Sequence, residues 1–185
     1  MARSTGAVRV GQGWDVHRLV PGRPLRLGGV DVPFERGLLG HSDGDVVLHA
    51  IVDALLGAAA AGDIGQHFPD TDPRYRGIDS AVLVEQVVKL VEGRGYGVGN
   101  VDVTILAEQP KLAPHVGALQ HRVAALLRIE PAQVGIKAKT MEGLGAIGGG
   151  EAIAALAVLT LAPAARRPRS GRAPARARSR VRGRR

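Results

Sequence analysis

The 185-residue sequence has no cysteine, which excludes disulfide bonds and thiolate chemistry and is compatible with a reducing compartment. A bound metal ion would therefore need histidine, aspartate or glutamate ligands. Aromatic residues make up only 3% of the chain, which argues against nucleic-acid binding through stacked aromatic rings. The first ten residues lack the apolar run of a signal peptide, and no segment reaches the roughly 20 apolar residues of a membrane span. We therefore expect a soluble cytoplasmic protein with no membrane partner.

Charge is distributed unevenly along the chain. The formal net charge is +8, but residues 163–185 carry ten arginines and no acid, which leaves residues 1–162 with a net charge of −2. Little in this tail can be buried, so we expect one folded domain over residues 1–162 and a disordered arginine-rich tail over residues 163–185. The tail is either a solubilising extension or a weak, salt-sensitive contact for nucleic acid or another anionic surface. The acidic body argues against nucleic-acid binding as the main function.

Hydrophobic residues recur with helix and strand periods in alternating segments of the chain. Residues 7–19 and 23–34 predict the two strands of a hairpin around the turn-prone sequence VPGRP. Three further strands and three helices follow from the periodicity and from the glycines that end the helices. The strands are predicted over residues 98–110, 134–140 and 152–162, and the helices over residues 46–61, 80–95 and 113–129. The alanines of residues 152–162 would also tolerate a helix.

This order of elements predicts an α/β fold of the α+β sandwich type, in which helices cover one face of a small mixed sheet. The other face also needs a cover, and another subunit is the interpretation that we favour. Ser42 and Asp43 are good N-cap residues for the first helix. Pro114 suits the first turn of the third helix.

The sequence GWDVHRL places Asp15 and His17 two residues apart on the first predicted strand. Such side chains point to the same side, so they can reach a common point. His49, on the first predicted helix, would complete a set of two imidazoles and one carboxylate that suits zinc and leaves a position open for a substrate oxygen. An ordinary surface pair and a hydrogen-bonded helix histidine are the alternatives, because spacing alone cannot bring a strand and a helix together.

Other polar residues near His49 have two interpretations each. Asp45 and Asp53 lie at helical spacing from His49. Each has two interpretations: it orients the second ring nitrogen of His49, or it is an exposed acidic residue of the helix. His41 and Ser42 precede the helix, where free backbone N–H groups attract phosphate, or they cap the helix without a ligand.

Loops later in the chain carry further candidates. Asp63 and Asp70 lie in loops rich in glycine and proline, where acidic residues are usually solvated. Lys111, Lys139 and Glu142 lie in flexible segments of the kind that a site for a charged nucleotide needs. The two lysines are equally compatible with ordinary surface charges.

Four long motifs carry a resemblance that extends over residues 8–161. The chain resembles the 2-C-methyl-D-erythritol 2,4-cyclodiphosphate synthases, a family of the non-mevalonate isoprenoid (MEP) pathway. The arginine-rich tail has no counterpart in this resemblance. The motifs are GWDVHRL, GLLGHSDGDVVLHAIVDALLGAAAAGDIGQHFPDTDP, GNVDVTILAEQPKLAPH and IKAKTMEGLGAIGGGEAIA.

The resemblance implies a homotrimer with active sites between neighbouring subunits. It implies a lyase that converts 4-diphosphocytidyl-2-C-methyl-D-erythritol 2-phosphate into the 2,4-cyclodiphosphate and CMP. By the same resemblance, Asp15, His17 and His49 bind a zinc ion, and Glu142 helps to bind a magnesium or manganese ion. No protein nucleophile is required.

The resemblance also implies which residues contact the substrate. His41 and Thr140 are implied as catalytic hydrogen-bond donors near the reacting phosphates, and the segment around Lys111 as the cytidine pocket of the adjacent subunit. The implied substrate-binding residues are Asp15, Val16, His17, His41, Ser42, Asp63, Ile64, Gly65, Phe68, Pro69, Asp70, Thr71, Asp72, Ala107, Lys111, Leu112, Ala113, Lys139, Thr140, Met141, Glu142, Ala146 and Gly149.

Some positions depart from the family's usual pattern. Ala146 stands where an aromatic residue is common and Gly149 where an arginine is common, which argues against an isoprenoid diphosphate ligand in the central cavity of a trimer. Lys139 and Met141 stand where threonines are frequent. A zinc site of this composition also fits a nucleotide hydrolase, which would release a linear instead of a cyclic diphosphate.

Overall fold

The computed structural model describes residues 7–164 of the chain. Residues 165–185 of the predicted tail lie outside the described residues, so the tail's disorder stays a prediction. Among residues 7–164, no helix combines the length and the apolar character needed to cross a membrane.

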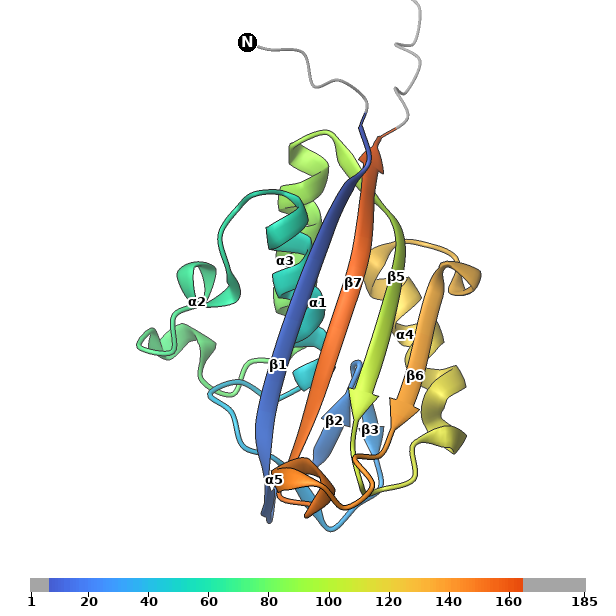
Figure 1. The fold of residues 1–185 in the computed structure, drawn as a ribbon. Coiled ribbons are helices and arrows are strands. Elements are labelled where there is room, and N and C mark those ends of the chain that lie inside the picture. Colours follow the sequence, from blue (N-terminus) through green and yellow to red (C-terminus); the bar gives the residue numbers. More distant parts are fainter. Residues whose placement is uncertain (1–6, 165–185) are drawn as a thin grey trace, which may run out of the picture.

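Within residues 7–164, five strands form a mixed sheet in the order β4-β1-β7-β5-β6 (Figure 1). All neighbours are antiparallel except β5 and β6, which are parallel. The mixed sheet of the α/β prediction is therefore confirmed. The strands are β1 Arg9–Pro21, β4 Arg36–Leu38, β5 Tyr96–Leu106, β6 Val134–Lys139 and β7 Ala152–Pro163.

The predicted hairpin between residues 7–19 and 23–34 is wrong. β1 pairs with β4 and β7, whereas β2 (Leu25–Leu27) and β3 (Val30–Val32) pair with each other in a separate two-stranded sheet. The physical reason is the pair Gly28 and Gly29, which both adopt positive φ angles, of 58° and 75°. Two such residues make the tight two-residue turn that suits a hairpin, so the chain turns back at residues 28 and 29.

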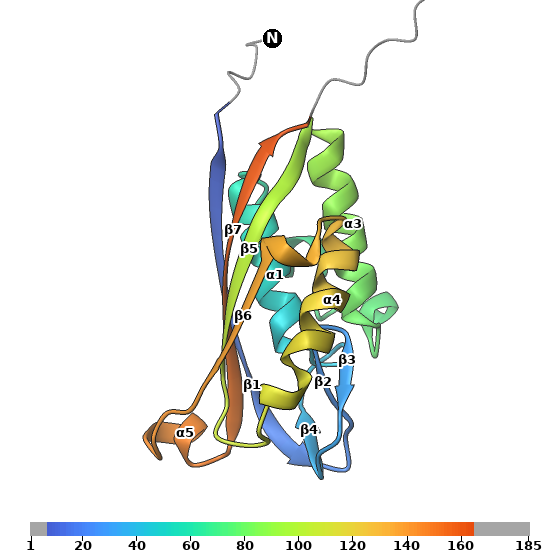
Figure 2. The same ribbon diagram turned by 90° about the vertical axis from the view of Figure 1, so that its right-hand side faces the viewer.

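Three long helices cover one face of the sheet, as predicted (Figures 1 and 2). They are α1 (Val46–Ala58), α3 (Ser80–Gly93) and α4 (Val116–Leu127). The shorter turns are α2 Ile64–His67, α5 Gly145–Gly148 and the 3-10 turns Pro73–Tyr75, Ala113–His115 and Pro131–Gln133. Pro114 therefore lies in a 3-10 turn directly before α4, and the α-helix itself begins later than predicted.

The N-cap of α1 also differs from the prediction. Asp45, not Ser42 or Asp43, caps the helix, because its carboxylate accepts hydrogen bonds from the N–H groups of Val47 and Leu48. These two N–H groups are consequently used within the protein, and the phosphate contact expected of His41 and Ser42 stays a prediction.

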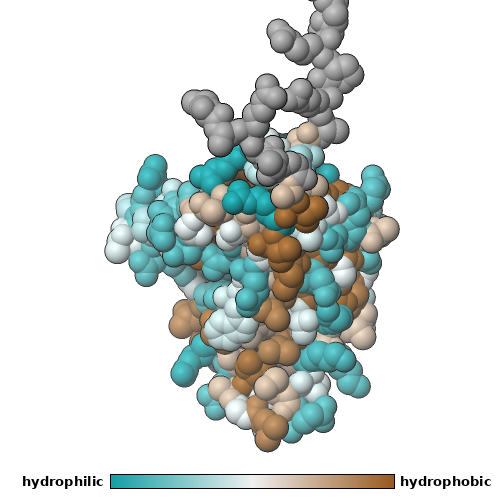
Figure 3. Space-filling view, turned by 45° about the horizontal axis from the view of Figure 1, so that its top comes forward, coloured by the Kyte–Doolittle hydropathy of each residue, from teal (hydrophilic) through white to brown (hydrophobic). Residues whose placement is uncertain are grey.

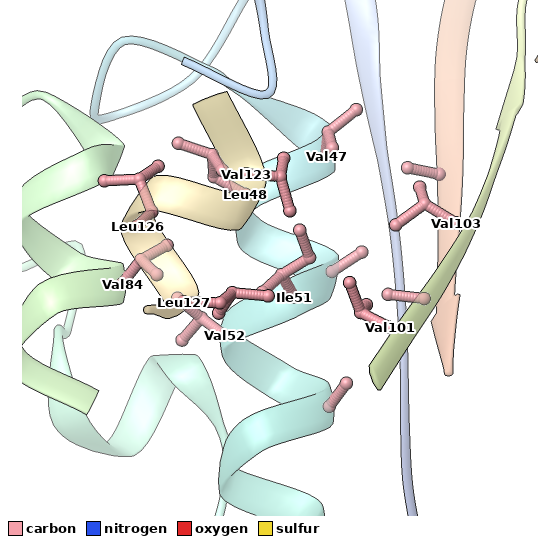
Figure 4. Close-up of a cluster of buried hydrophobic side chains, with 14 of the residues drawn as sticks. Val47, Leu48, Ile51, Val52, Val84, Val101, Val103, Val123, Leu126 and Leu127 are labelled. Atoms are coloured by element: carbon pink, nitrogen blue, oxygen red, sulfur yellow. The ribbon is translucent and has the colours of Figure 1, made fainter. Parts of the chain in front are cut away.

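The hydrophobic core lies between the helices and the sheet. Figure 4 shows Ile51 of α1 between Leu127 of α4 and Val101 of β5, and all three side chains are almost completely buried. β1 packs directly on the backbone of α1, because a Cβ atom at Gly13 would lie 2.0 Å from the carbonyl oxygen of Ala50. Glycine at this position therefore fixes how closely the next residues of β1 approach α1.

The opposite face of the sheet is open in one copy of the chain. Val10, Trp14 and Val16 of β1 and Val158 of β7 lie on this face and are exposed, with Trp14 at 52%. Figure 3 shows a stripe of hydrophobic residues along this side of the molecule. The helices thus cover one face, and apolar side chains mark the other.

Candidate active site and metal centre

Three side chains converge where β1 meets α1. Asp15 and His17 point from β1 toward the helices, and His49 points from α1 toward them. The Oδ2 atom of Asp15 lies 2.9 Å from Nε2 of His17 and 2.9 Å from Nδ1 of His49, and the two ring nitrogens are 3.1 Å apart. The predicted convergence of a strand pair and a helix histidine is therefore confirmed, and these atoms form a group that can hold a metal ion.

The two ligand types shift each other's protonation. Burial raises the pKa of the Asp15 carboxyl, but hydrogen bonds from His17 and His49 and their charges outweigh burial and hold this pKa well below its ordinary value of 3.8. Burial lowers the pKa of His17, but its hydrogen bond to Asp15, the charge of Asp15 and the hydrogen bond to Leu39 together outweigh that effect, so the pKa lies above 6.5. Without a metal ion, the cluster therefore pairs the negative charge of Asp15 with the positive charge of His17.

One histidine is oriented by the backbone. The Nδ1 atom of His17 lies 2.7 Å from the carbonyl oxygen of Leu39, which can only accept a hydrogen bond. Nδ1 therefore carries a hydrogen, so Nε2 is the nitrogen that donates to Asp15 without a metal ion and that is left to bind one after losing its own hydrogen. This is the arrangement that a metal-binding imidazole needs.

Two serines, which the sequence analysis did not assign to this role, contact the other ring nitrogen of His49. The Oγ atoms of Ser42 and Ser80 each lie 2.9 Å from Nε2 of His49, and both serines are buried. Ser80 is 31 residues away in sequence, so local spacing held no signal for it.

Of the two interpretations of Asp45 and Asp53, the one in which they orient His49 does not hold, and for Asp45 the exposed alternative is wrong as well. The carboxylate of Asp45 is fully buried and binds the N–H groups of Gly28 and Gly29, besides capping α1. Burial raises the pKa of this carboxyl. Asp53 accepts a hydrogen bond from the N–H of Ile64 and thereby fixes the loop that follows α1.

The cluster lies in a pocket of about 460 Å³. Many residues that were expected to bind substrate line it, together with Asp53, Tyr75, Ile78 and Leu83, which were not assigned to binding. The expected residues that line it are Asp15, His17, His41, Ser42, Ile64, Gly65, Phe68, Pro69 and Asp70.

Other expected residues of these segments have different contacts. The side chain of Val16 lies on the open face of the sheet. Asp63 caps α2 and accepts from the N–H of Gln66. Asp72 caps the next 3-10 turn and pairs with Arg74, whose hydrogen bond lowers the pKa of the Asp72 carboxyl. Thr71 is exposed beside it.

A second pocket, of about 210 Å³, lies at the carboxyl ends of β5 and β6. It shares no lining residue with the pocket around His49, as far as residues 7–164 are concerned. Glu108, Pro110 and Ala138 complete its wall. The expected residues that it brings together are Ala107, Lys111, Leu112, Ala113, Lys139 and Thr140.

The segment after β6 connects to this second pocket. The hydroxyl of Thr140 donates to the exposed carboxylate of Glu142, at 2.8 Å, and the N–H of Met141 donates to Glu108. Within the described residues, Glu142 is not part of the group formed by Asp15. Ala146 and Gly149 lie in and directly after α5, outside the lining of either pocket in this part of the chain.

Comparison with protein families gives one match that spans the folded part of the chain. The YgbB family model matches residues 8–162. The chain belongs to the YgbB family. Curated YgbB relatives bear the name 2-C-methyl-D-erythritol 2,4-cyclodiphosphate synthase. One from Trichlorobacter lovleyi is 58% identical over 84% of this chain and 99% of its own length. One from Nitrosospira multiformis is 60% identical over 83% of this chain and 86% of its own length.

Solved structures of similar proteins have the same fold. A 2C-methyl-D-erythritol-2,4-cyclodiphosphate synthase in a form with bound CDP has a TM-score of 0.77 and 44% identity, and the match covers 83% of this chain and 99% of that one. The bifunctional IspDF of Campylobacter jejuni has a TM-score of 0.83 and 38% identity over 86% of this chain, which spans only 43% of that longer protein. The YgbB fold is thus established for this chain.

Proposed function

We propose that this YgbB-family chain is a lyase that converts 4-diphosphocytidyl-2-C-methyl-D-erythritol 2-phosphate into 2-C-methyl-D-erythritol 2,4-cyclodiphosphate and CMP. The reaction belongs to the MEP pathway of isoprenoid biosynthesis. The observation that carries the proposal is the convergence of Asp15, His17 and His49 in one pocket of a chain that is 58% identical to a named synthase.

The ligand set of this pocket fits zinc. Ligand atoms of a tetrahedral zinc site with bonds of about 2.0 Å stand about 3.3 Å apart. The three atoms of Asp15, His17 and His49 form a nearly equilateral triangle with sides of 2.9 to 3.1 Å, so a small outward adjustment suffices. A zinc ion bound there would neutralise phosphate charge and polarise a phosphoryl oxygen.

A second, harder cation suits the carboxylate of Glu142. This side chain is exposed beside Thr140 and can bind magnesium or manganese together with phosphate oxygens. The identity of each ion is part of the proposal.

The reaction needs positioning and charge neutralisation more than covalent chemistry. An oxygen of the 2-phosphate attacks the β-phosphorus, the new P–O bond closes the ring, and the bond between the β-phosphorus and the bridging oxygen breaks as CMP departs. His41 is exposed in the first pocket, where its ring can donate a hydrogen bond to a phosphate. Thr140 in the second pocket can donate likewise, and the apolar side chains of Phe68 and Ile64 limit access of water.

We further propose that the chain forms a homotrimer in which the pocket of one subunit with His49 faces the pocket of its neighbour with Lys111. The separation of the two pockets within one chain supports this arrangement, because one substrate must contact both. The exposed apolar residues of the open sheet face, with Trp14 among them, support burial of that face against other subunits. The cytoplasmic location remains a prediction.

Phosphorus NMR of the reaction mixture tests the function. Purified protein is given the diphosphocytidyl methylerythritol phosphate substrate with zinc and magnesium. We expect signals of CMP and of a cyclic diphosphate in equal amounts. A linear diphosphate would instead identify a hydrolase, and an unchanged substrate with folded, metal-loaded protein would overturn the proposal.

A further inference from the structure

A series of hydrogen-bonded polar side chains extends from the metal cluster into the protein interior. The Nε2 atom of His49 lies 2.9 Å from the Oγ atom of Ser80, and that hydroxyl lies 2.5 Å from Oδ1 of Asp43. The other carboxylate oxygen of Asp43 lies 3.4 Å from a guanidinium nitrogen of Arg26. Ser80 is completely buried, so these contacts replace water for its hydroxyl.

The carboxylate of Asp43 decides where the hydrogen of the Ser80 hydroxyl points. A carboxylate only accepts hydrogen bonds, and Asp43 accepts them from the hydroxyl and backbone N–H of Ser80, from the backbone N–H of Asp45 and from Arg26. Since the single hydroxyl hydrogen of Ser80 is used toward Asp43, its oxygen can offer His49 only a lone pair.

The neighbouring hydroxyl of Ser42 contacts both groups. Its oxygen accepts the N–H of Gly44, at 3.2 Å, and lies 3.3 Å from the oxygen of Ser80. Ser80, whose hydrogen is used toward Asp43, therefore faces the Nε2 atom of His49 with a lone pair, which is favourable only when Nε2 carries a hydrogen. The hydroxyl of Ser42 is compatible with this arrangement, because it can point its own hydrogen to the oxygen of Ser80.

We infer that Ser80, held by Asp43 and Arg26, is a positioning residue that keeps a hydrogen on Nε2 of His49 and so reserves Nδ1 for the metal ion. The inference rests on the proposed zinc centre. It makes His49 the counterpart of His17, whose far nitrogen is held by the carbonyl of Leu39. The negative charge of Asp43, transmitted through the Ser80 hydroxyl, also makes the ring of His49 a stronger ligand.

Arg26 has a supporting role in this line. Its guanidinium contacts Asp43, Asp79 and Asp31, at 3.4, 3.2 and 3.0 Å, and β2 thereby joins the first residues of α3. The salt bridge between Arg26 and Asp43 keeps that carboxylate aimed at Ser80. The ligand His49 is consequently oriented by groups from three segments of the chain.

The first test measures zinc affinity by competition with a chromogenic chelator. Ser80→Ala removes the acceptor with little change of volume, and we expect zinc to bind about 10–100-fold more weakly, the usual effect of losing a partner behind a metal ligand. Asp79→Asn is the matched control, because it alters the same end of α3 and the same arginine without touching His49. We expect the control to stay within about twofold of the wild type, and thermal unfolding of each variant verifies the fold.

The second test identifies the nitrogen that carries the hydrogen. Long-range proton–nitrogen correlation spectra of the ¹⁵N-labelled, zinc-loaded wild type should show a hydrogen on Nε2 of His49 and none on Nδ1. A bare Nε2 would overturn the inference, and this spectrum decides alone if Ser80→Ala does not fold. Equal zinc affinity of wild type and Ser80→Ala would overturn only the inference, whereas a wild type that binds no zinc would remove the proposed zinc centre as well.

Discussion

The Nδ1 atom of His49 lies 3.1 Å from the Nε2 atom of His17, although 32 residues separate the two in sequence. Two imidazole nitrogens at this distance, with the carboxylate of Asp15 beside both, form a site for a cation. The close packing of β1 on α1 produces the contact. Metal binding by these three residues therefore depends on how closely β1 packs on α1.

Loss of the helix ligand should remove both the metal and the activity. We expect His49→Ala to lower zinc content to background and turnover by more than about 100-fold, since even groups behind a ligand contribute about 10–100-fold. Metal analysis and initial rates check this. His121→Ala, on the exposed side of α4, is the control and should behave as wild type. Near-normal turnover of His49→Ala with zinc still bound would contradict the ligand assignment.

A side chain at position 13 should disturb both the packing of β1 on α1 and the metal cluster. In Gly13→Ala the new Cβ would meet the carbonyl oxygen of Ala50 at 2.0 Å, so strand and helix must separate. We expect a loss of roughly 1–3 kcal/mol or more in the free energy of unfolding and weaker zinc binding. Urea denaturation and chelator competition measure the two effects.

Gly97→Ala in β5 provides the matched strand control, because a Cβ there would meet no described atom within 4 Å. The account requires Gly97→Ala to keep wild-type zinc affinity. Equal stability of the two glycine variants would show that β1 does not pack on α1 as described.

The pH dependence of the metal-free protein follows from the cluster. The pKa of Asp15 is depressed below 3.8, so its stabilising contribution is present above that pH and is lost on acidification. The pKa of His17 is raised above 6.5, so its contribution is present below pH 6.5 and is lost as the pH rises through the raised value. Stability should therefore fall on both sides of the range from 3.8 to 6.5.

Urea denaturation of chelator-treated protein at a series of pH values measures this dependence. Asp15→Asn removes the partner of His17, so we expect the fall in stability above neutral pH to become shallower in this variant. An unchanged slope would mean that Asp15 does not hold the proton of His17.

The open sheet face provides a test of assembly. Trp14 is 52% exposed there, and a charge at its position should prevent burial of the face against other subunits. We expect light scattering to give a trimer for wild type and a monomer for Trp14→Glu. Val82→Glu on α3, where the valine is 40% exposed, should remain a trimer. A monomeric wild type, or a trimeric Trp14→Glu, would contradict the proposed assembly.

Local sequence patterns indicated the three long helices and the strand that carries Asp15 and His17, whereas the full set with His49 was implied by the family resemblance. The period of two placed Asp15 and His17 on one side of a strand, and the helical period placed His49 on α1. Partners that fold from distant segments were missed. Ser80 reaches His49 only because α3 packs beside α1, and Asp45 binds Gly28 and Gly29, which precede it by 17 and 16 residues.

The missed hairpin has a similar cause. The turn at Gly28 and Gly29 is a strong local signal, but one long predicted strand over residues 23–34 was extended across it. β1 pairs with β4 and β7, and β7 lies at the far end of the described residues. The partners of β1 are therefore set by contacts between segments that are far apart in sequence. Pairing between strands that are far apart in sequence is determined by tertiary packing, so a short window of sequence does not predict it.

The most direct test of the account is a zinc titration of metal-free protein with formation of the cyclic diphosphate as the readout, in the presence of magnesium. We predict negligible product without zinc, a linear rise as zinc is added, and saturation at one zinc ion per chain. His49→Ala should give no rise at the same zinc concentrations. Full formation of the cyclic product by the zinc-free protein would contradict the account.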